Sequence, residues 1–88
     1  MAIWPDWWNW PVETTPHLLD RMLDRGFNEV DLRTMLTDAV TCTVDASPGR
    51  WRVETTWSGQ GWRVIVEPDE SRKVVVVVTA YRYSLSLP

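Results

Sequence analysis

Hydrophobic and polar positions follow two different periods along this 88-residue chain. Between residues 16 and 41, apolar side chains recur every three or four positions, which is typical of amphipathic helices. From residue 50 onward they recur at every second position, which is typical of strands with one buried face. The pattern therefore predicts an α+β domain in which two helices precede and cover an antiparallel sheet.

The first helix is expected at residues 16–25. Thr15 is a good N-cap, and Gly26 can adopt the left-handed conformation that often ends a helix. The second helix is expected at residues 29–41, where Asn28 and the acidic residue three positions later resemble a capping box. Because only two or three residues connect the helices, we expect a tight helical hairpin or an L-shaped corner.

Three strands are expected after the helices, at residues 50–57, 62–67 and 73–81. Short polar segments at residues 58–61 and 68–72 supply the turns between them. The order is therefore α-α-β-β-β, with a three- to four-stranded antiparallel meander.

A register for this sheet follows from its alternating pattern. We expect Trp57 to pair with Trp62, and Val66 to pair with Val74, which directs one apolar face toward the helices. A slip of one residue in the last strand would exchange its two faces. In the expected register, the outer face, away from the helices, carries Arg50, Arg52, Glu54, Arg63, Ile65, Glu67, Val75, Val77, Thr79 and Tyr81.

Residues 1–13 form a tryptophan-rich arm that precedes a single domain at residues 14–88. The arm holds four tryptophans and two prolines within eight positions, and exposed tryptophans in this number would favour aggregation. Because Ile65, Val75 and Val77 lack a cover on the outer face, we expect the arm to lie over them. Nucleobase stacking by the arm is an alternative, and another is pairing of two copies through Trp4, Trp7, Trp8 and Trp10.

Composition is that of a soluble globular domain, with 44% hydrophobic and 24% charged residues. Cys42 is the single cysteine and cannot form an internal disulfide, and the amino terminus lacks the pattern of a signal peptide. The longest apolar run, residues 74–78, is far shorter than the ~18 residues of a membrane span. We therefore expect a cytoplasmic protein with no membrane segment.

The net charge of −3 argues mildly against a nucleic-acid partner, because phosphate binding needs a positive surface. The charge is unevenly distributed. Residues 1–47 contain three basic and eight acidic side chains, whereas residues 48–88 contain six basic and four acidic ones. The carboxyl-terminal half is therefore the cationic half.

The first helix carries one candidate for acid–base chemistry. His17 and Arg21 lie four residues apart along its flank, and imidazole transfers protons near neutral pH while guanidinium binds phosphate oxygens. The alternative is an ordinary solvated helix surface. Motifs for phosphate loops, serine nucleophiles and Cys/His metal sites are absent from the sequence, so we expect no metal and no cofactor.

The sheet carries a second candidate surface, in which arginines alternate with aromatic residues. Such a surface could hold an RNA backbone and stack a base, although solvated strand faces have the same composition. The candidate RNA-binding residues are Arg50, Arg52, Arg63 and Arg82.

Residues 14–81 resemble a bacterial domain-of-unknown-function family with the helix motif H-x-x-x-R-M-x-x-R-G, an "E-x-D-L" second helix and a final Thr-x-Tyr strand. This family is similar to the barnase, EndoU, colicin and RelE-like (BECR) group of ribonuclease toxins. The resemblance implies a RelE-like fold, and it nominates His17, Arg21, Thr79 and Tyr81 as catalytic residues.

Two functions follow as hypotheses. The first is a toxin of a toxin–antitoxin system, acting as a metal-independent endoribonuclease. In it, His17 would be the general acid or base, Arg21 and Arg63 would bind phosphate, Tyr81 would stack on or orient the RNA, and an antitoxin protein would be the partner. The second is a non-catalytic interaction module, or an inactive toxin relative, that docks a protein or self-associates through the arm.

Overall fold

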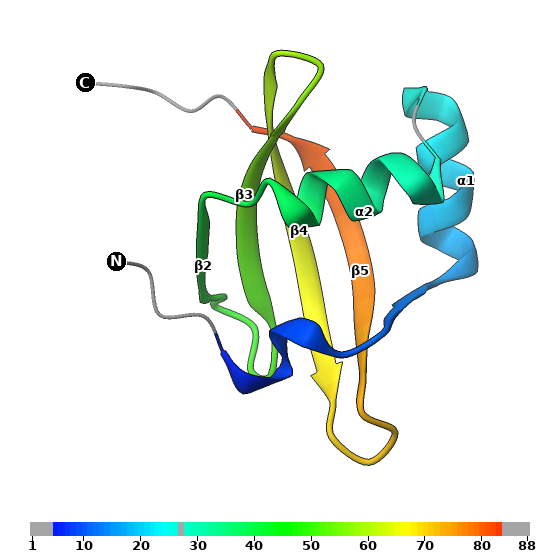
Figure 1. Ribbon diagram of the computed structural model, residues 1–88. Coiled ribbons are helices and arrows are strands. Elements are labelled where there is room, and N and C mark those ends of the chain that lie inside the picture. The colour runs from blue at the N-terminus through cyan, green and yellow to red at the C-terminus, as the bar shows by residue number, and fades with distance from the viewer. Residues whose placement is uncertain (1–4, 27, 84–88) are drawn as a thin grey trace.

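The computed structural model describes residues 5–26 and 28–83, without the side chains of His17, Leu19, Leu23 and Arg25 (Figure 1). A short 3-10 helix and a short strand precede two α-helices and four further strands. In chain order the elements are η1 (Asp6–Asn9), β1 (Val12–Thr14), α1 (Pro16–Arg25), α2 (Glu29–Thr37), β2 (Thr41–Val44), β3 (Trp51–Trp57), β4 (Gln60–Asp69) and β5 (Val74–Arg82).

The strands form one mixed sheet of five, in the order β1-β5-β4-β3-β2. Strand β1 is parallel to β5, and the other neighbours are antiparallel. The predicted α+β class is confirmed, but the predicted three- to four-stranded antiparallel meander is wrong. The arm adds β1 at one edge, where the Val75 amide donates to the Pro11 carbonyl at 2.8 Å, and residues 41–44 add β2 at the other.

Both helices begin where the sequence predicts. Thr15 Oγ1 accepts a hydrogen bond from the Leu18 amide at 3.2 Å, and Asn28 forms a reciprocal capping box at the start of α2. Helix α2 ends at Thr37 instead of residue 41. The chain there is rich in β-branched residues, which favour strands. The Val40 amide donates to the backbone carbonyl of Glu54 in β3 at 2.8 Å instead of to a helical partner.

The hairpin between β3 and β4 is tighter than predicted. Ser58 and Gly59 have φ angles of 53° and 75°, as a two-residue type I′ turn requires. Trp57 therefore pairs with Gln60, and the predicted pairing of Trp57 with Trp62 is wrong. Because the shift is two residues, each side chain stays on its predicted face, and these two indoles still pack edge to face with centroids 6.1 Å apart.

The register between β4 and β5 differs from the predicted one, and it contains a β-bulge. Ile65 pairs with Thr79, but the next residue of β4, Val66, pairs with Val77, so that Val78 is the extra residue. The predicted pairing of Val66 with Val74 is therefore wrong. The bulge changes which valines are buried: Val75 and Val77 join the core in place of Val74, Val76 and Val78, whereas Ala80 is buried as predicted.

The helices and the arm share one face of the sheet. In Figure 1, α2 crosses the upper half of the sheet and η1 crosses the lower half on the same side. The core between the layers consists of Trp7, Leu18, Met22, Leu32, Met35, Leu36, Val53, Trp62, Val64, Val66, Val75, Val77 and Ala80.

The arm covers the sheet, as predicted, but on the helix side. Trp7 packs against Trp51 with ring centroids 5.4 Å apart and belongs to the same core as Val75. Ile65 lies on the outer face, so its predicted cover by the arm is wrong. The physical reason is the length of α2, because nine residues span only about 14 Å at 1.5 Å per residue and leave the lower half of the sheet to the arm.

Candidate functional site

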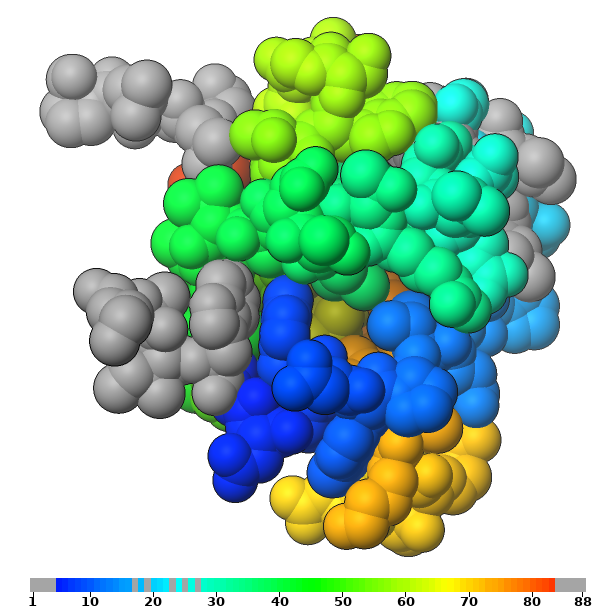
Figure 2. Space-filling model, in the orientation of Figure 1, coloured from blue at the N-terminus to red at the C-terminus, as the bar shows by residue number. Residues whose placement is uncertain are grey.

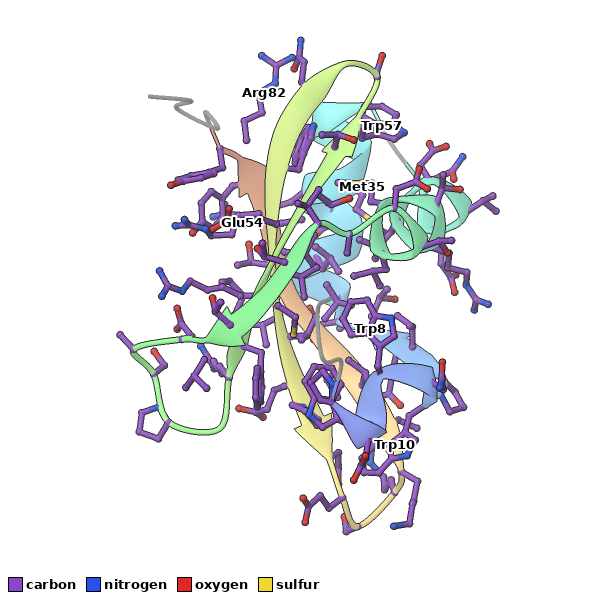
Figure 3. The ribbon with its side chains drawn as sticks, turned by 60° about the vertical axis from the view of Figure 1, so that its left-hand side comes forward. Trp8, Trp10, Met35, Glu54, Trp57 and Arg82 are labelled. Carbon is purple, nitrogen blue, oxygen red and sulfur yellow. The ribbon has the colours of Figure 1, made fainter. Side chains whose placement is uncertain are left out.

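The outer face of the sheet gathers side chains from three neighbouring strands. Glu54 of β3 pairs with Arg63 of β4, which in turn pairs with Tyr81 of β5. In Figure 3, Glu54 lies on one side of the sheet, and Met35 and Trp8 lie on the other. We call the side chains of Glu54, Arg63, Tyr81 and Tyr83 the outer-face cluster.

Arg63 is the centre of the outer-face cluster. Its Nη2 donates to Glu54 Oε1 at 3.3 Å and its Nη1 donates to Tyr81 Oη at 3.4 Å, while its Cζ lies 3.7 Å from the ring centroid of Tyr83. The Arg63 side chain is only 15% exposed. The hydrogen bond to Tyr81 is the main cause that raises the pKa of Arg63, burial opposes it, and Glu54 adds to it, so the guanidinium stays charged.

Backbone contacts hold the aromatic part of the outer-face cluster in place. Tyr81 is fixed by the β4–β5 ladder, and the Tyr83 amide donates to the Gly61 carbonyl at 3.0 Å. A carboxylate, a guanidinium and a phenol are thus presented in one row by regular strands. This combination provides a proton acceptor, a fixed cation and a proton donor.

The predicted RNA-binding arginines lie mostly in ion pairs. Arg50 Nε lies 3.4 Å from Glu67, and Arg52 Nε lies 3.5 Å from Asp45. Arg82 pairs with the buried Trp62, so it belongs to the helix side of the sheet and not to the outer face with the other three arginines. It is exposed, and the described part of the chain offers it no ion-pair partner. The outer face is therefore closer to neutral than to strongly positive.

The predicted catalytic residues are divided between two layers. Thr79 and Tyr81 lie on the outer face, as the sequence predicts. Arg21 is exposed on α1, a helix whose Leu18 and Met22 are buried in the core on the opposite side of the sheet. The side chain of His17 lies outside the described residues. Tyr81 is thus brought to Arg63, and no contact between Tyr81 and Arg21 is found among the described side chains.

Two members of the outer-face cluster were not predicted. Glu54 was placed on the outer face, but the two-residue error in register put it opposite Ile65 instead of Arg63. The "SG" dipeptide at 58–59 is the signal for a tighter turn that would have corrected this. Tyr83 follows the last strand and has no periodic signal of its own.

Metal and thiol chemistry find little support in the described part of the structure. Among residues 5–26 and 28–83, no group of three or more His, Cys, Asp or Glu side chains could hold a metal ion. Burial raises the pKa of the Cys42 thiol to about 11. Near neutral pH this thiol is therefore protonated and a poor nucleophile.

Comparison with known proteins finds no match to this chain among protein-family models, curated proteins or solved structures. The resemblance to ribonuclease toxins therefore stays a prediction. The described helices also include none that is long and apolar enough to span a membrane.

Proposed function

We propose that the protein is a metal-independent endoribonuclease that binds RNA on the outer face of its sheet. The observation that carries this proposal is the hydrogen-bonded row of Glu54, Arg63 and Tyr81. Cleavage of RNA needs a base for the 2′-hydroxyl, a cation for the phosphate and an acid for the leaving oxygen, and the row supplies one group for each task.

The reaction follows from these three roles. Glu54 accepts the proton of a ribose 2′-hydroxyl, whose oxygen attacks the adjacent phosphorus. The bond from phosphorus to the 5′-oxygen breaks, and that oxygen takes a proton from Tyr81. Arg63 donates hydrogen bonds to the non-bridging oxygens throughout. The products are a 2′,3′-cyclic phosphate and a 5′-hydroxyl, and solvent returns a proton from Glu54 to Tyr81.

The hydrogen bonds that Arg63 makes within the row can be exchanged for hydrogen bonds to a substrate. The two contacts of Arg63, at 3.3 and 3.4 Å, are long for charge-assisted bonds. Long contacts in a free enzyme often shorten when substrate arrives. Tyr83 stacks on Arg63 and keeps the guanidinium in place while its partners change.

The test is cleavage of a fluorophore–quencher RNA by the purified protein in the presence of a chelator. We expect the wild type to cleave, and Glu54→Gln and Tyr81→Phe each to lower the rate by about 100-fold or more. Glu29→Gln is the control, because it removes an exposed carboxylate from α2. His17→Ala in the same assay tests the role predicted for that residue from the sequence.

A substrate control identifies the nucleophile. An RNA with 2′-deoxyribose at the cleaved position should resist cleavage, and mass spectrometry should detect the cyclic phosphate on the normal substrate. Absence of cleavage by the wild type, or full activity of both outer-face variants, would refute the proposal.

For the cellular role we propose a cytoplasmic toxin with a neutralising antitoxin protein as its partner. A ribonuclease without such a partner would degrade the RNA of its own cell. Induced expression of the wild type should therefore slow growth, and Glu54→Gln should not. Equal growth of the two cultures would contradict the toxin role.

The second candidate function is a non-catalytic binding module. It is favoured by the ion pairs that neutralise Arg50 and Arg52 and by a pocket beside the arm. Self-association through the arm is less favoured, because Trp7 is only 8% exposed and lies in the core of its own chain. A contact through this indole would require the arm to leave the sheet.

A further inference from the structure

A pocket of about 270 Å³ lies between the arm and α2, on the face opposite the outer-face cluster. Figure 2 shows it as a hollow between the arm and α2, with β4 and β5 visible at its base. Its lining combines large apolar side chains with a few polar ones: Trp7, Trp8, Asn9, Val12, Arg33, Leu36, Thr37, Val66 and Val75.

The apolar part of the pocket is held by the core. Trp7 packs against Trp51 at 5.4 Å and against Trp8 at 5.9 Å, and the Trp8 amide donates to the Pro5 carbonyl at 3.0 Å. Val66 and Val75 are part of the buried core. Indole walls favour a flat aromatic ligand, since aromatic pairs add about 0.5–1.5 kcal/mol beyond the burial of area.

One described side chain brings a charge to the pocket. Among the residues that the structure describes, Arg33 is the only ionisable one that lines the pocket, and none of them contributes a carboxylate to the lining. Its Nη2 lies 3.0 Å from Glu29 in an exposed i,i+4 ion pair, a kind of pair that contributes little stability. A guanidinium has five N–H donors, so Arg33 can bind a carboxylate in addition to this contact or in exchange for it.

We propose that this pocket binds a small aromatic monocarboxylate, with its ring beside Trp7 and Trp8 and its carboxylate on Arg33. The volume is just below the ~300–1,000 Å³ of usual ligand sites, which limits the ligand to one or two rings. The site is independent of the ribonuclease proposal, because its residues belong to the other face of the sheet.

The experiment uses 1-naphthoate as the probe and 1-naphthamide as its uncharged counterpart of nearly the same shape. Two-dimensional NMR follows the indole N–H signals of the seven tryptophans, assigned by Trp→Phe variants. We expect naphthoate to shift the signals of Trp7 and Trp8 and to leave those of Trp57 and Trp62 unchanged, because the latter two do not line the pocket. Naphthamide should bind about tenfold more weakly.

Arg33→Gln tests the role of the charge. It should weaken naphthoate binding about tenfold, the equivalent of about 1.4 kcal/mol, and leave naphthamide binding unchanged. Arg21→Gln is the matched control, because it removes another exposed arginine, on α1, that does not line the pocket. The proposal is overturned by no shift at Trp7 and Trp8, by shifts spread over all the tryptophans, by equal affinity for the two probes, or by unchanged naphthoate affinity of Arg33→Gln.

Discussion

Thr55 is a fully buried polar residue among apolar neighbours. Its hydroxyl donates a hydrogen bond to the Met35 carbonyl, which belongs to the last turn of α2. Carbonyl groups in the last turn of a helix have no partner within the helix. Thr55 therefore joins α2 to β3 and satisfies two buried polar groups at once.

We expect Thr55→Val to lower the free energy of unfolding by about 1–2 kcal/mol. Valine keeps the shape of threonine, but it leaves the Met35 carbonyl without its partner. Chemical denaturation measures the loss, and Thr56→Val is the control, because Thr56 is the exposed neighbour on the same strand. Equal stability of the two variants would show that the Thr55 hydroxyl contributes nothing.

In β3, the sequence predicts which face each side chain occupies better than it predicts the residue with which each one pairs. The alternation along β3 correctly directs Thr55 toward the helices and Glu54 away from them. The partner of each residue depends on where α2 ends and on the length of one turn. Both are decided by contacts between distant segments, which a local pattern does not contain.

Among the elements, the long periodic ones were predicted and the short ones were not. Helix α1 and strand β3 carry several periods of their pattern, so the sequence defines them well. Strand β1 has three residues and β2 has four, too few for a period. Their strand conformation comes from hydrogen bonds to β5 and β3, which only the folded chain provides.

The contribution of the arm to the stability of the fold can be tested by truncating its tryptophans. We expect Trp7→Ala to lower the free energy of unfolding by about 3–5 kcal/mol, as other large core truncations do, because Trp7 is buried against Trp51. Trp10→Ala should cost less, since Trp10 is only partly buried and its ring lies 5.2 Å from the Lys73 ammonium.

Denaturant titrations of the two variants measure this difference. Trp10→Ala is a matched control, because it removes the same side chain from the same arm. Equal losses of stability would mean that burial against the sheet does not distinguish these two tryptophans, and the proposed cover would then be wrong.

At the scale of the whole molecule, the two faces of the sheet differ in what covers them. One face buries the core beneath α1, α2 and the arm, and the other carries polar rows that no helix of the described chain covers. Five consecutive valines make β5 apolar on both faces, and the bulge decides which of them face the core. Val75 and Val77 are buried beneath the helices and the arm, whereas Val76 pairs with Glu67 on the outer face. The outer face thus combines apolar side chains, such as Ile65 and Val76, with the hydrogen-bonded row of Glu54, Arg63 and Tyr81.

This division predicts the behaviour of a chain without the arm. Size-exclusion chromatography with light scattering should show a monomer for the full-length protein, and unfolded or self-associated material for residues 12–88. Removal of η1 takes Trp7 from the core and uncovers Trp51 and Val75, and exposed apolar patches of this kind promote association. If both chains are equally stable monomers, the arm is not an essential cover. If only the full-length chain forms a dimer, the arm is a contact between copies.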